Sequence, residues 1–296
     1  MERISKQHEK FRMMKDYIKK CPQGYTVTDD LEIIDLALNN NLEIDLALIT
    51  FDNIFSNLAN SVIARLKEKS KEIYEISSSS YDQLKLKDNH AGVIVIIKMK
   101  SYSLYDFKNK DFIVVLDKLE IPGNVGTIFR TLDSINVDGV IMCDSVTKIN
   151  NINVTSSSRG CNLLIPTVSE EYNKIVNYLL DNNYDIYLGE PILGKSYQDY
   201  DYKGKIAIIV GNERFGINPD WYNHKSKKVF IPMEGTQNSL NVGVALSILA
   251  YEAYMKRNSS NWFRGISLCF FSYSSYFKFY ISKFYYCTIC SKHSYK

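Results

Sequence analysis

The feature of this sequence that most restricts its fold is a series of short apolar runs between residues 112 and 231. Their continuous apolar character, rich in β-branched residues, is typical of strands buried on both faces rather than on one. Segments long enough for helices separate several of them, a pattern that predicts an α/β fold with a mainly parallel sheet. The five predicted strands are Phe112–Asp117 (FIVVLD), Gly139–Asp144 (GVIMCD), Asp185–Leu188, Lys205–Val210 (KIAIIV) and Lys228–Ile231.

Residues 1–107 show a second, smaller α/β pattern. Helical spacing of apolar residues alternates with strand-like runs, and Pro22 and Gly24 break the first helix. The residues Thr28–Asp30 offer an N-cap for the helix that follows. The predicted helices are 1–20, 31–38 and 53–69, and the predicted strands are 42–49, 72–76 and 93–99.

Composition narrows the class of protein. A hydrophobic content of 45% with 23% charged residues is typical of a globular protein. The sequence has no uncharged apolar run long enough to span a membrane, and its charged N-terminal residues do not resemble a secretory signal. The six cysteines are irregularly spaced, which does not suggest a disulfide framework. We therefore expect a cytoplasmic protein in a reducing compartment.

Charge is unevenly distributed. Residues 258–296 hold five basic and no acidic residues, so residues 1–257 carry 31 basic against 33 acidic groups. Global charge therefore does not indicate a nucleic-acid-binding protein, and only local patches could. One such patch is residues 1–20, with seven basic and three acidic residues. It fits either a solvated helix face or an RNA contact.

The segment 258–296 has no clear helical or strand period and contains 13 of the 38 aromatic residues of the chain. We expect it to be a low-complexity, disordered tail. Cys287, Cys290 and His293 within it resemble half of a zinc site. A structural zinc site needs four ligands, and no second CxxC pair is present, so no metal is expected.

Unusual polar residues follow three of the predicted strands, at the edge where open α/β sheets bind ligands. Each of the three loops alone is compatible with an ordinary turn or helix cap: Asn124 could be a helix cap, Glu213 a solvated turn residue and Ser239 an N-cap. Their common position at strand ends, in this order, favours one binding site. The loops are PGNVGTIFRT (122–131), VGNERFG (210–216) and IPMEGTQNSLNVGVAL (231–246).

Together these loops resemble the three motifs of the SpoU branch of the SPOUT RNA methyltransferases, and the resemblance covers residues 112–256. It implies a C-terminal trefoil-knotted methyltransferase domain (108–257), an exception to the rule that chains avoid knots. It also implies two protomers that pack to form the sites, and S-adenosylmethionine as the cofactor. No GxGxxG follows a strand, which disfavours a Rossmann-type cofactor site.

The resemblance assigns roles to individual residues. Arg130 would lie near a ribose 2′-hydroxyl as base or electrostatic stabiliser, and Asn124 would orient it. Glu213 would hold its loop and pair with Arg130. Ser239 and Asn241 would position ribose and cofactor. The expected cofactor contacts are Leu188, Gly211, Ile231, Met233 and Leu240.

A further segment, Thr155–Gly160 (TSSSRG), resembles the SRG segment of thiostrepton- and nosiheptide-resistance methyltransferases. That likeness implies that Arg159 contacts RNA or the partner's site, and that residues 1–107 form a ribosomal-protein-like RNA-binding domain. The favoured function is 2′-O-methylation of 23S ribosomal RNA, at an adenosine, with thiopeptide resistance as its biological role. A transfer-RNA ribose methyltransferase and a catalytically vestigial RNA-binding protein are the alternatives.

Overall fold

The computed structural model describes residues 1–53, 56–87 and 91–270, with side chains described up to Asn258. Residues 1–257 form one compact unit, and residues 258–296 form a second. The helices and strands are β1 (Glu2–Arg3), α1 (Glu9–Lys19), β2 (Tyr25–Thr28), α2 (Leu31–Asn39), β3 (Ile44–Ile49), α3 (Asn57–Lys69), β4 (Ser70–Glu75), α4 (Ser78–Tyr81), β5 (Val93–Lys98), β6 (Phe112–Asp117), α5 (Pro122–Ser134), β7 (Gly139–Cys143), α6 (Ile152–Ser157), β8 (Thr167–Glu170), α7 (Tyr172–Asp181), β9 (Asp185–Glu190), β10 (Lys195–Ser196), β11 (Ile206–Val210), β12 (Ser226–Phe230) and α8 (Val242–Phe270).

The N-terminal elements build a five-stranded mixed sheet in the order β1-β4-β3-β5-β2. β3 pairs in parallel with β4 and antiparallel with β5, which also pairs antiparallel with β2. Asp30 caps α2 as expected, its carboxylate accepting a hydrogen bond from the Glu32 amide. The strand β2 was not predicted, because its four residues (YTVT) lie between a break and a cap and carry little periodic signal.

The C-terminal elements build a seven-stranded sheet in the order β10-β12-β9-β11-β6-β7-β8, and every strand pair described in it is parallel. The parallel α/β prediction is confirmed, but the predicted number of five strands is wrong. The missed strands are β8 and β10, which lie at the two edges of this sheet. Both are short, and the partly exposed sequences TVSE and KS lack the continuous apolar run that marks the central strands.

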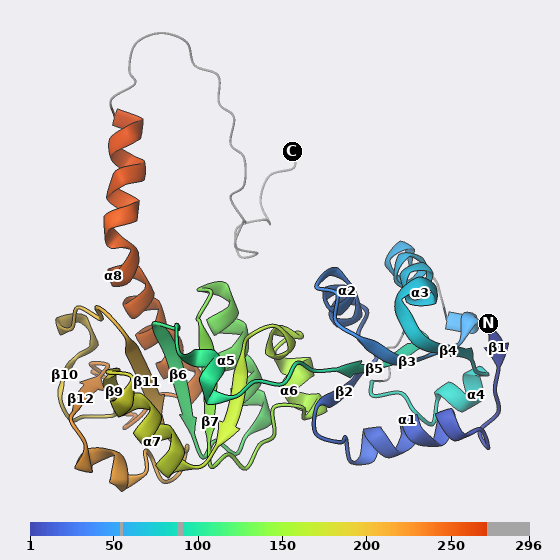
Figure 1. Ribbon diagram of the computed structural model, residues 1–296, viewed down its shortest axis with the longest axis horizontal. Helices are drawn as coiled ribbons and strands as arrows, with labels where there is room; N and C mark the ends of the chain where they lie inside the picture. Colours follow the sequence, from blue (N-terminus) through green and yellow to red (C-terminus); the bar gives the residue numbers. More distant parts are fainter. Residues whose placement is uncertain (54–55, 88–90, 271–296) are drawn as a thin grey trace. The chain divides into compact units, whose positions relative to one another are not determined.

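The sheet is covered on both faces, as the continuous apolar strands indicated (Figure 1). All six residues of β6 are buried, and the first five alternate between two core clusters. Val114 and Leu116 pack in a cluster with residues of α5 and α8, whereas Ile113 and Val115 pack in a cluster with residues of α7. Burial of a Val, Leu or Ile side chain contributes about 1.5–3 kcal/mol each, so the central strands hold the loops at their ends firmly.

The last helix is longer than predicted. The nearly continuous apolar positions of residues 241–256 predict a helix that closes the fold, and this helix is α8, which starts at Val242 and continues to Phe270. The expected irregular chain after residue 257 is therefore helical over 258–270. No proline lies in this stretch to end the helix. The remainder of the predicted tail, including Cys287, Cys290 and His293, lies outside the described residues.

Candidate functional site

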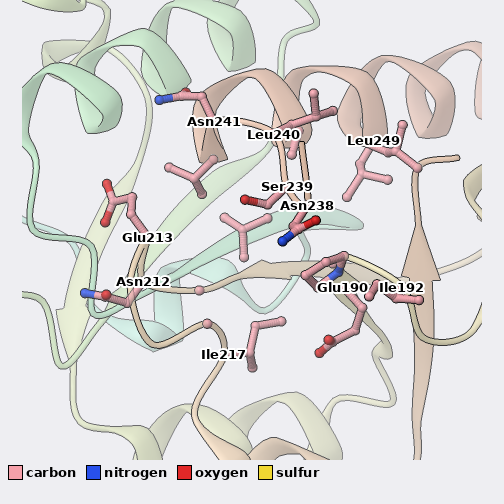
Figure 2. Close-up of a pocket in the computed structure, with 18 of the residues that line it drawn as sticks. Glu190, Ile192, Asn212, Glu213, Ile217, Asn238, Ser239, Leu240, Asn241 and Leu249 are labelled. Atoms are coloured by element: carbon pink, nitrogen blue, oxygen red, sulfur yellow. The ribbon is translucent and has the colours of Figure 1, made fainter. Parts of the chain in front are cut away.

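A cavity of about 660 Å³ opens at the carboxyl ends of β9, β11 and β12 and beside the start of α8 (Figure 2). This volume is within the range of small-molecule sites. Its wall is largely apolar, and its polar groups come from the loops that follow the strands. The strand-end expectation therefore holds for the cavity: parallel strands bring loops that are distant in sequence to one edge.

The loop after β11 is held in shape by Asn212, which is buried. Its Oδ1 accepts hydrogen bonds from the amides of Arg214 and Phe215, and its Nδ2 donates to the Lys118 carbonyl oxygen at 2.8 Å. Asn212 and Gly216 also exchange two backbone hydrogen bonds, each 2.9 Å long. Gly216 has φ +71°, a left-handed conformation that favours glycine. The loop is thus a small closed ring whose rim faces the cavity.

Gly211 lies at the base of this ring and lines the cavity. A Cβ at this position would lie 2.2 Å from the Gly216 carbonyl carbon and 2.3 Å from the Ile217 amide nitrogen. Both are backbone atoms that cannot rotate away, so only glycine fits. The sequence analysis expected Gly211 to contact the cofactor, and the structure adds close backbone packing as a reason for glycine at this position.

Three polar side chains from three distant segments of the chain form a hydrogen-bonded chain at the cavity. Asn124 Nδ2 donates to Glu213 Oε1 at 2.8 Å, and Asn241 Nδ2 donates to Asn124 Oδ1 at 3.1 Å. All three residues line the cavity. Glu213 and Asn241 lie on the same side of it (Figure 2). The expected pairing of Glu213 with Arg130 is not seen, because the Glu213 carboxylate bonds to Asn124 instead.

Asn241 has a structural role that was assigned to Ser239. The Asn241 Oδ1 accepts hydrogen bonds from the amides of Gly243 and Val244, so Asn241 is the N-cap of α8. The alternative interpretation of Ser239 as the N-cap of this helix is therefore wrong. Ser239 and Leu240 precede the helix and line the cavity. Asn124 likewise does not cap α5, which begins at Pro122 with Ile121 as its N-cap residue.

The residues expected to contact a cofactor separate into two groups. Gly211, Ile231, Met233 and Leu240 all line the cavity. Leu188 does not, because its fully buried side chain belongs to the core cluster on the α7 side of the sheet. Side chains alternate along a strand, so the strand end reaches the cavity at the next residue, Gly189.

Arg130 is not among the residues that line the cavity. It lies in the third turn of α5 and is exposed. Among the described residues it has no hydrogen-bond or ion-pair partner. Burial raises the pKa of the Cys161 thiol to about 12, and the positive charge of Arg130 opposes part of this increase. Among the described residues the guanidinium is therefore an unpaired cation on the surface of α5, outside the cavity lining.

Arg159 is not among the residues that line the cavity. It forms an exposed ion pair with Glu32, with 2.6 Å between Nη1 and Oε2. The next residue, Gly160, has φ +85°, and a Cβ there would lie 2.8 Å from Leu36 Cδ2. The TSSSRG segment therefore packs against α2. The hydroxyls of Thr155 and Thr26 add a buried hydrogen bond of 3.0 Å in the same region.

Several residues that line the cavity were not predicted from the sequence: Glu190, Ile192, Asn238 and Ile217. The signal for Glu190 was present, since it ends β9 as Asp117 ends β6. Burial raises the pKa of the Glu190 carboxyl, while Lys228 opposes this shift. Ile217 carried no signal, because an isolated apolar residue in a loop is uninformative before its neighbours are known.

Asp117, the last residue of β6, holds the segment that follows the β11 loop. Its Oδ2 accepts hydrogen bonds from the Asn218 amide at 2.7 Å and from Trp221 Nε1 at 3.2 Å. Burial raises the pKa of this carboxyl, and the hydrogen bond from the Asn218 amide partly offsets that effect. Asp117 thus ties the end of β6 to the chain that follows the β11 loop.

Comparison with solved structures defines the fold. The AdoMet-bound rRNA methyltransferase from Sinorhizobium meliloti matches with a TM-score of 0.75 at 21% identity, over 86% of this chain and 97% of that one. The SpoU methyltransferase AviRb from Streptomyces viridochromogenes, solved with AdoMet, matches with a TM-score of 0.73 at 21% identity, over 85% of this chain and 100% of that one. The fold is therefore that of the α/β RNA methyltransferases.

The sequence comparisons specify the family. The model of the SpoU rRNA methylase family matches residues 111–251. A Staphylococcus haemolyticus protein assigned to the TrmH family of tRNA/rRNA methyltransferases is 30% identical over 67% of this chain and 83% of its own length. The 23S rRNA (guanosine(2553)-2′-O)-methyltransferase RlmP of Bacillus subtilis is 30% identical over 47% of this chain and 56% of its own. The chain belongs to the SpoU rRNA methylase family.

Within the described part of the chain, none of the helices combines the length and the hydropathy needed to cross a bilayer.

Proposed function

We propose that this protein transfers a methyl group from S-adenosylmethionine to a ribose 2′-hydroxyl of 23S ribosomal RNA. The observation that carries the proposal is the Glu213–Asn124–Asn241 chain of hydrogen bonds at the cavity, with Asn124 in the centre, in a member of the SpoU rRNA methylase family. The Bacillus subtilis relative is a 23S rRNA 2′-O-methyltransferase, which supports ribose as the site of methylation.

The chemistry of the cavity fits the cofactor. S-adenosylmethionine joins a flat adenine ring to a positively charged sulfonium. The cavity offers an apolar wall that includes Val229 and Leu249, and the carboxylate of Glu213. Carboxylates favour a cation nearby, and apolar side chains favour a ring. The backbone of Gly211, Ile231, Met233 and Leu240 would hold the adenosyl group.

When bound, S-adenosylmethionine supplies an electrophilic methyl group for an in-line displacement. The protein must then position the ribose hydroxyl and stabilise the charge that develops on its oxygen. Asn124, fixed by Glu213 and Asn241, would position that ribose. The Ser239 hydroxyl lines the cavity and has no hydrogen-bond partner among the described residues, so it is available to the substrate.

Arg130 would stabilise the developing alkoxide. A guanidinium has a pKa of about 12.5 or higher, so it serves as an electrostatic group more readily than as a base. Since Arg130 lies outside the cavity of its own chain, we propose a homodimer in which it faces bound RNA or the cavity of the partner. The trefoil knot of the methyltransferase domain stays a prediction beside this proposal.

Residues 1–107 would recruit the RNA. The basic patch of residues 1–20 includes Arg12 and Lys15 on α1, which have no ion-pair partner in the described part of the chain. Arg159 would join this surface, because its ion pair with Glu32 is exposed and such pairs contribute only about 0–1 kcal/mol. A phosphate could therefore displace Glu32 at little cost.

Two alternatives remain, a transfer-RNA methyltransferase and a catalytically vestigial RNA-binding protein. The Staphylococcus haemolyticus relative is described by a name that includes both tRNA and rRNA, which favours testing transfer RNA as well. The adenosine target and a role in thiopeptide resistance rest on the TSSSRG segment alone. A catalytically vestigial RNA-binding protein is disfavoured, because Asn124, Glu213 and Asn241 remain and are joined by hydrogen bonds.

The test is methyl transfer to separate RNA fractions. The purified protein would be incubated with labelled S-adenosylmethionine and protein-free 23S rRNA, 16S rRNA or bulk tRNA, and methylated nucleosides identified by mass spectrometry. We expect 2′-O-methylation of 23S rRNA. Arg130→Ala should abolish transfer and retain cofactor binding, whereas the control Lys203→Ala, which removes an exposed charge, should retain both. Transfer to tRNA alone, to a base nitrogen, or undiminished in Arg130→Ala would contradict the proposal.

A further inference from the structure

Glu190 is a carboxylate at the cavity for which the proposed methyl transfer has no use. It ends β9 and lines the cavity, beside Ile192 and across from Glu213 and Asn241 (Figure 2). The methyl group must be transferred where Asn124, Glu213 and Asn241 meet. A carboxylate on the opposite side therefore cannot act on the reacting atoms, but it can contact a distal part of the bound cofactor.

The Glu190 side chain is held in place by its neighbours. The Tyr222 hydroxyl donates a hydrogen bond to Glu190 Oε1. The Lys228 ammonium lies 4.8 Å from the centre of the Tyr222 ring. On the adjacent strand, Phe230 pairs with Glu190, which fixes the backbone. Among the described residues, Oε2 has no hydrogen-bond partner. The carboxylate is thus anchored through one oxygen and has its second oxygen available.

The walls near Glu190 favour one part of the cofactor. Val210, Ile217, Val229 and Leu249 line the same cavity, and apolar side chains of this kind suit a flat adenine ring. A ribose lies directly next to that ring and carries two vicinal hydroxyls. A carboxylate accepts hydrogen bonds from such a pair, and charge-assisted hydrogen bonds of this type are stronger than neutral ones.

We propose that Glu190, held by Tyr222, accepts hydrogen bonds from the ribose hydroxyls of the cofactor and so recognises its adenosyl part. This inference rests on the proposed function, because it takes S-adenosylmethionine as the cofactor. It assigns Glu190 to affinity for the cofactor rather than to the methyl-transfer step.

The test is calorimetric titration of the full chain with S-adenosylhomocysteine and with 5′-methylthioadenosine, which lacks the amino-acid arm. Glu190→Gln should weaken both ligands by the same factor, about tenfold or more for hydrogen bonds to a charged group. Tyr222→Phe should weaken both by a smaller factor, because the carboxylate remains but loses its anchor. The control Glu171→Gln removes an equivalent charge at the start of α7, outside the cavity lining, and should bind both ligands as the unchanged protein does.

Analogues of 5′-methylthioadenosine that lack the 2′- or 3′-hydroxyl locate the contact. The unchanged protein should bind them more weakly, and Glu190→Gln should discriminate less between them and the parent compound. Glu190→Gln binding both ligands normally, or weakening S-adenosylhomocysteine alone, would overturn the inference and leave the proposed function intact. If neither ligand bound the unchanged protein, the proposed function itself would fail. Thermal unfolding of each variant without ligand identifies a folding defect, and Tyr222→Phe then decides.

Discussion

Replacing Gly211 with alanine should disable the cavity by opening the loop after β11. The added Cβ would lie 2.2 Å from the Gly216 carbonyl carbon and 2.3 Å from both the Gly216 oxygen and the Ile217 nitrogen. These separations are well below van der Waals contact, and all three atoms belong to the backbone. The Gly216 side of the loop must therefore move away from Gly211.

That movement removes the two backbone hydrogen bonds between Asn212 and Gly216. Each such bond contributes about 0.5–1.5 kcal/mol, so the expected loss in the free energy of unfolding is about 1–3 kcal/mol. The loop also carries Glu213, whose carboxylate holds Asn124. Binding of S-adenosylhomocysteine should therefore fall together with stability, and methyl transfer with both.

Urea denaturation measures the stability of the Gly211→Ala variant, and calorimetric titration measures its affinity for S-adenosylhomocysteine. The matched control is Gly235→Ala in the loop before α8, where a Cβ would meet no atom within 4 Å. The control should change neither quantity. If Gly211→Ala unfolded and bound ligand as the unchanged protein does, the close-packing explanation of this glycine would be refuted.

Three further predictions concern caps, buried charge and surface pairs. Asn241→Ala should lose about 0.5–2 kcal/mol of stability in urea denaturation through the lost N-cap, whereas Ser239→Ala should lose less than about 0.5 kcal/mol; equal losses would contradict the cap assignment. Because burial raises the pKa of Asp117 above its ordinary 3.8, the folded state holds this proton more tightly than the unfolded state. The contribution of Asp117 to the free energy of unfolding should therefore fall as the pH rises from its ordinary pKa of 3.8 to the raised pKa of the folded state. Unfolding measured against pH should show Asp117→Asn gaining on the unchanged protein with rising pH, and a parallel pair of curves would exclude this. Arg159→Ala should weaken rRNA binding in a filter assay and change stability by less than about 1 kcal/mol, while Glu32→Ala should leave RNA binding intact; equal effects would assign the pair a purely structural role.

The central strands of the C-terminal sheet could be predicted because their pattern is independent of context. Phe112–Asp117 is apolar almost throughout. In an α/β sequence, a short continuous apolar run of this kind is typical of a central parallel strand that is buried on both faces. The edge strand Thr167–Glu170 could not be predicted, since only one of its four side chains, that of Val168, is buried. The apolar pattern of the sequence thus indicates which segments are buried. It predicts secondary structure only where burial produces a clear pattern.

The candidate site was predictable to the same extent. Strand ends located the loops, so Glu213 and Asn241 could be placed at one edge before the fold was known. Their hydrogen-bond partners could not be assigned. The choice of the Glu213 carboxylate between Asn124 and Arg130 depends on distances of a few ångströms, which the sequence does not contain. The cap at Asn241 rather than Ser239 is a similar case, where two suitable residues lie two positions apart.

The hydrogen bonds at the cavity join residues that are far apart along the chain. Asn124 is separated from Glu213 by 89 positions and from Asn241 by 117. Contacts of such long range form late, because closing each long loop costs chain entropy before any bond repays it. During synthesis, a nascent chain that has not yet exposed Asn241 lacks one wall of the cavity. A ligand of this cavity would consequently bind only chains in which both long-range contacts have formed, and it would stabilise the fully folded state alone.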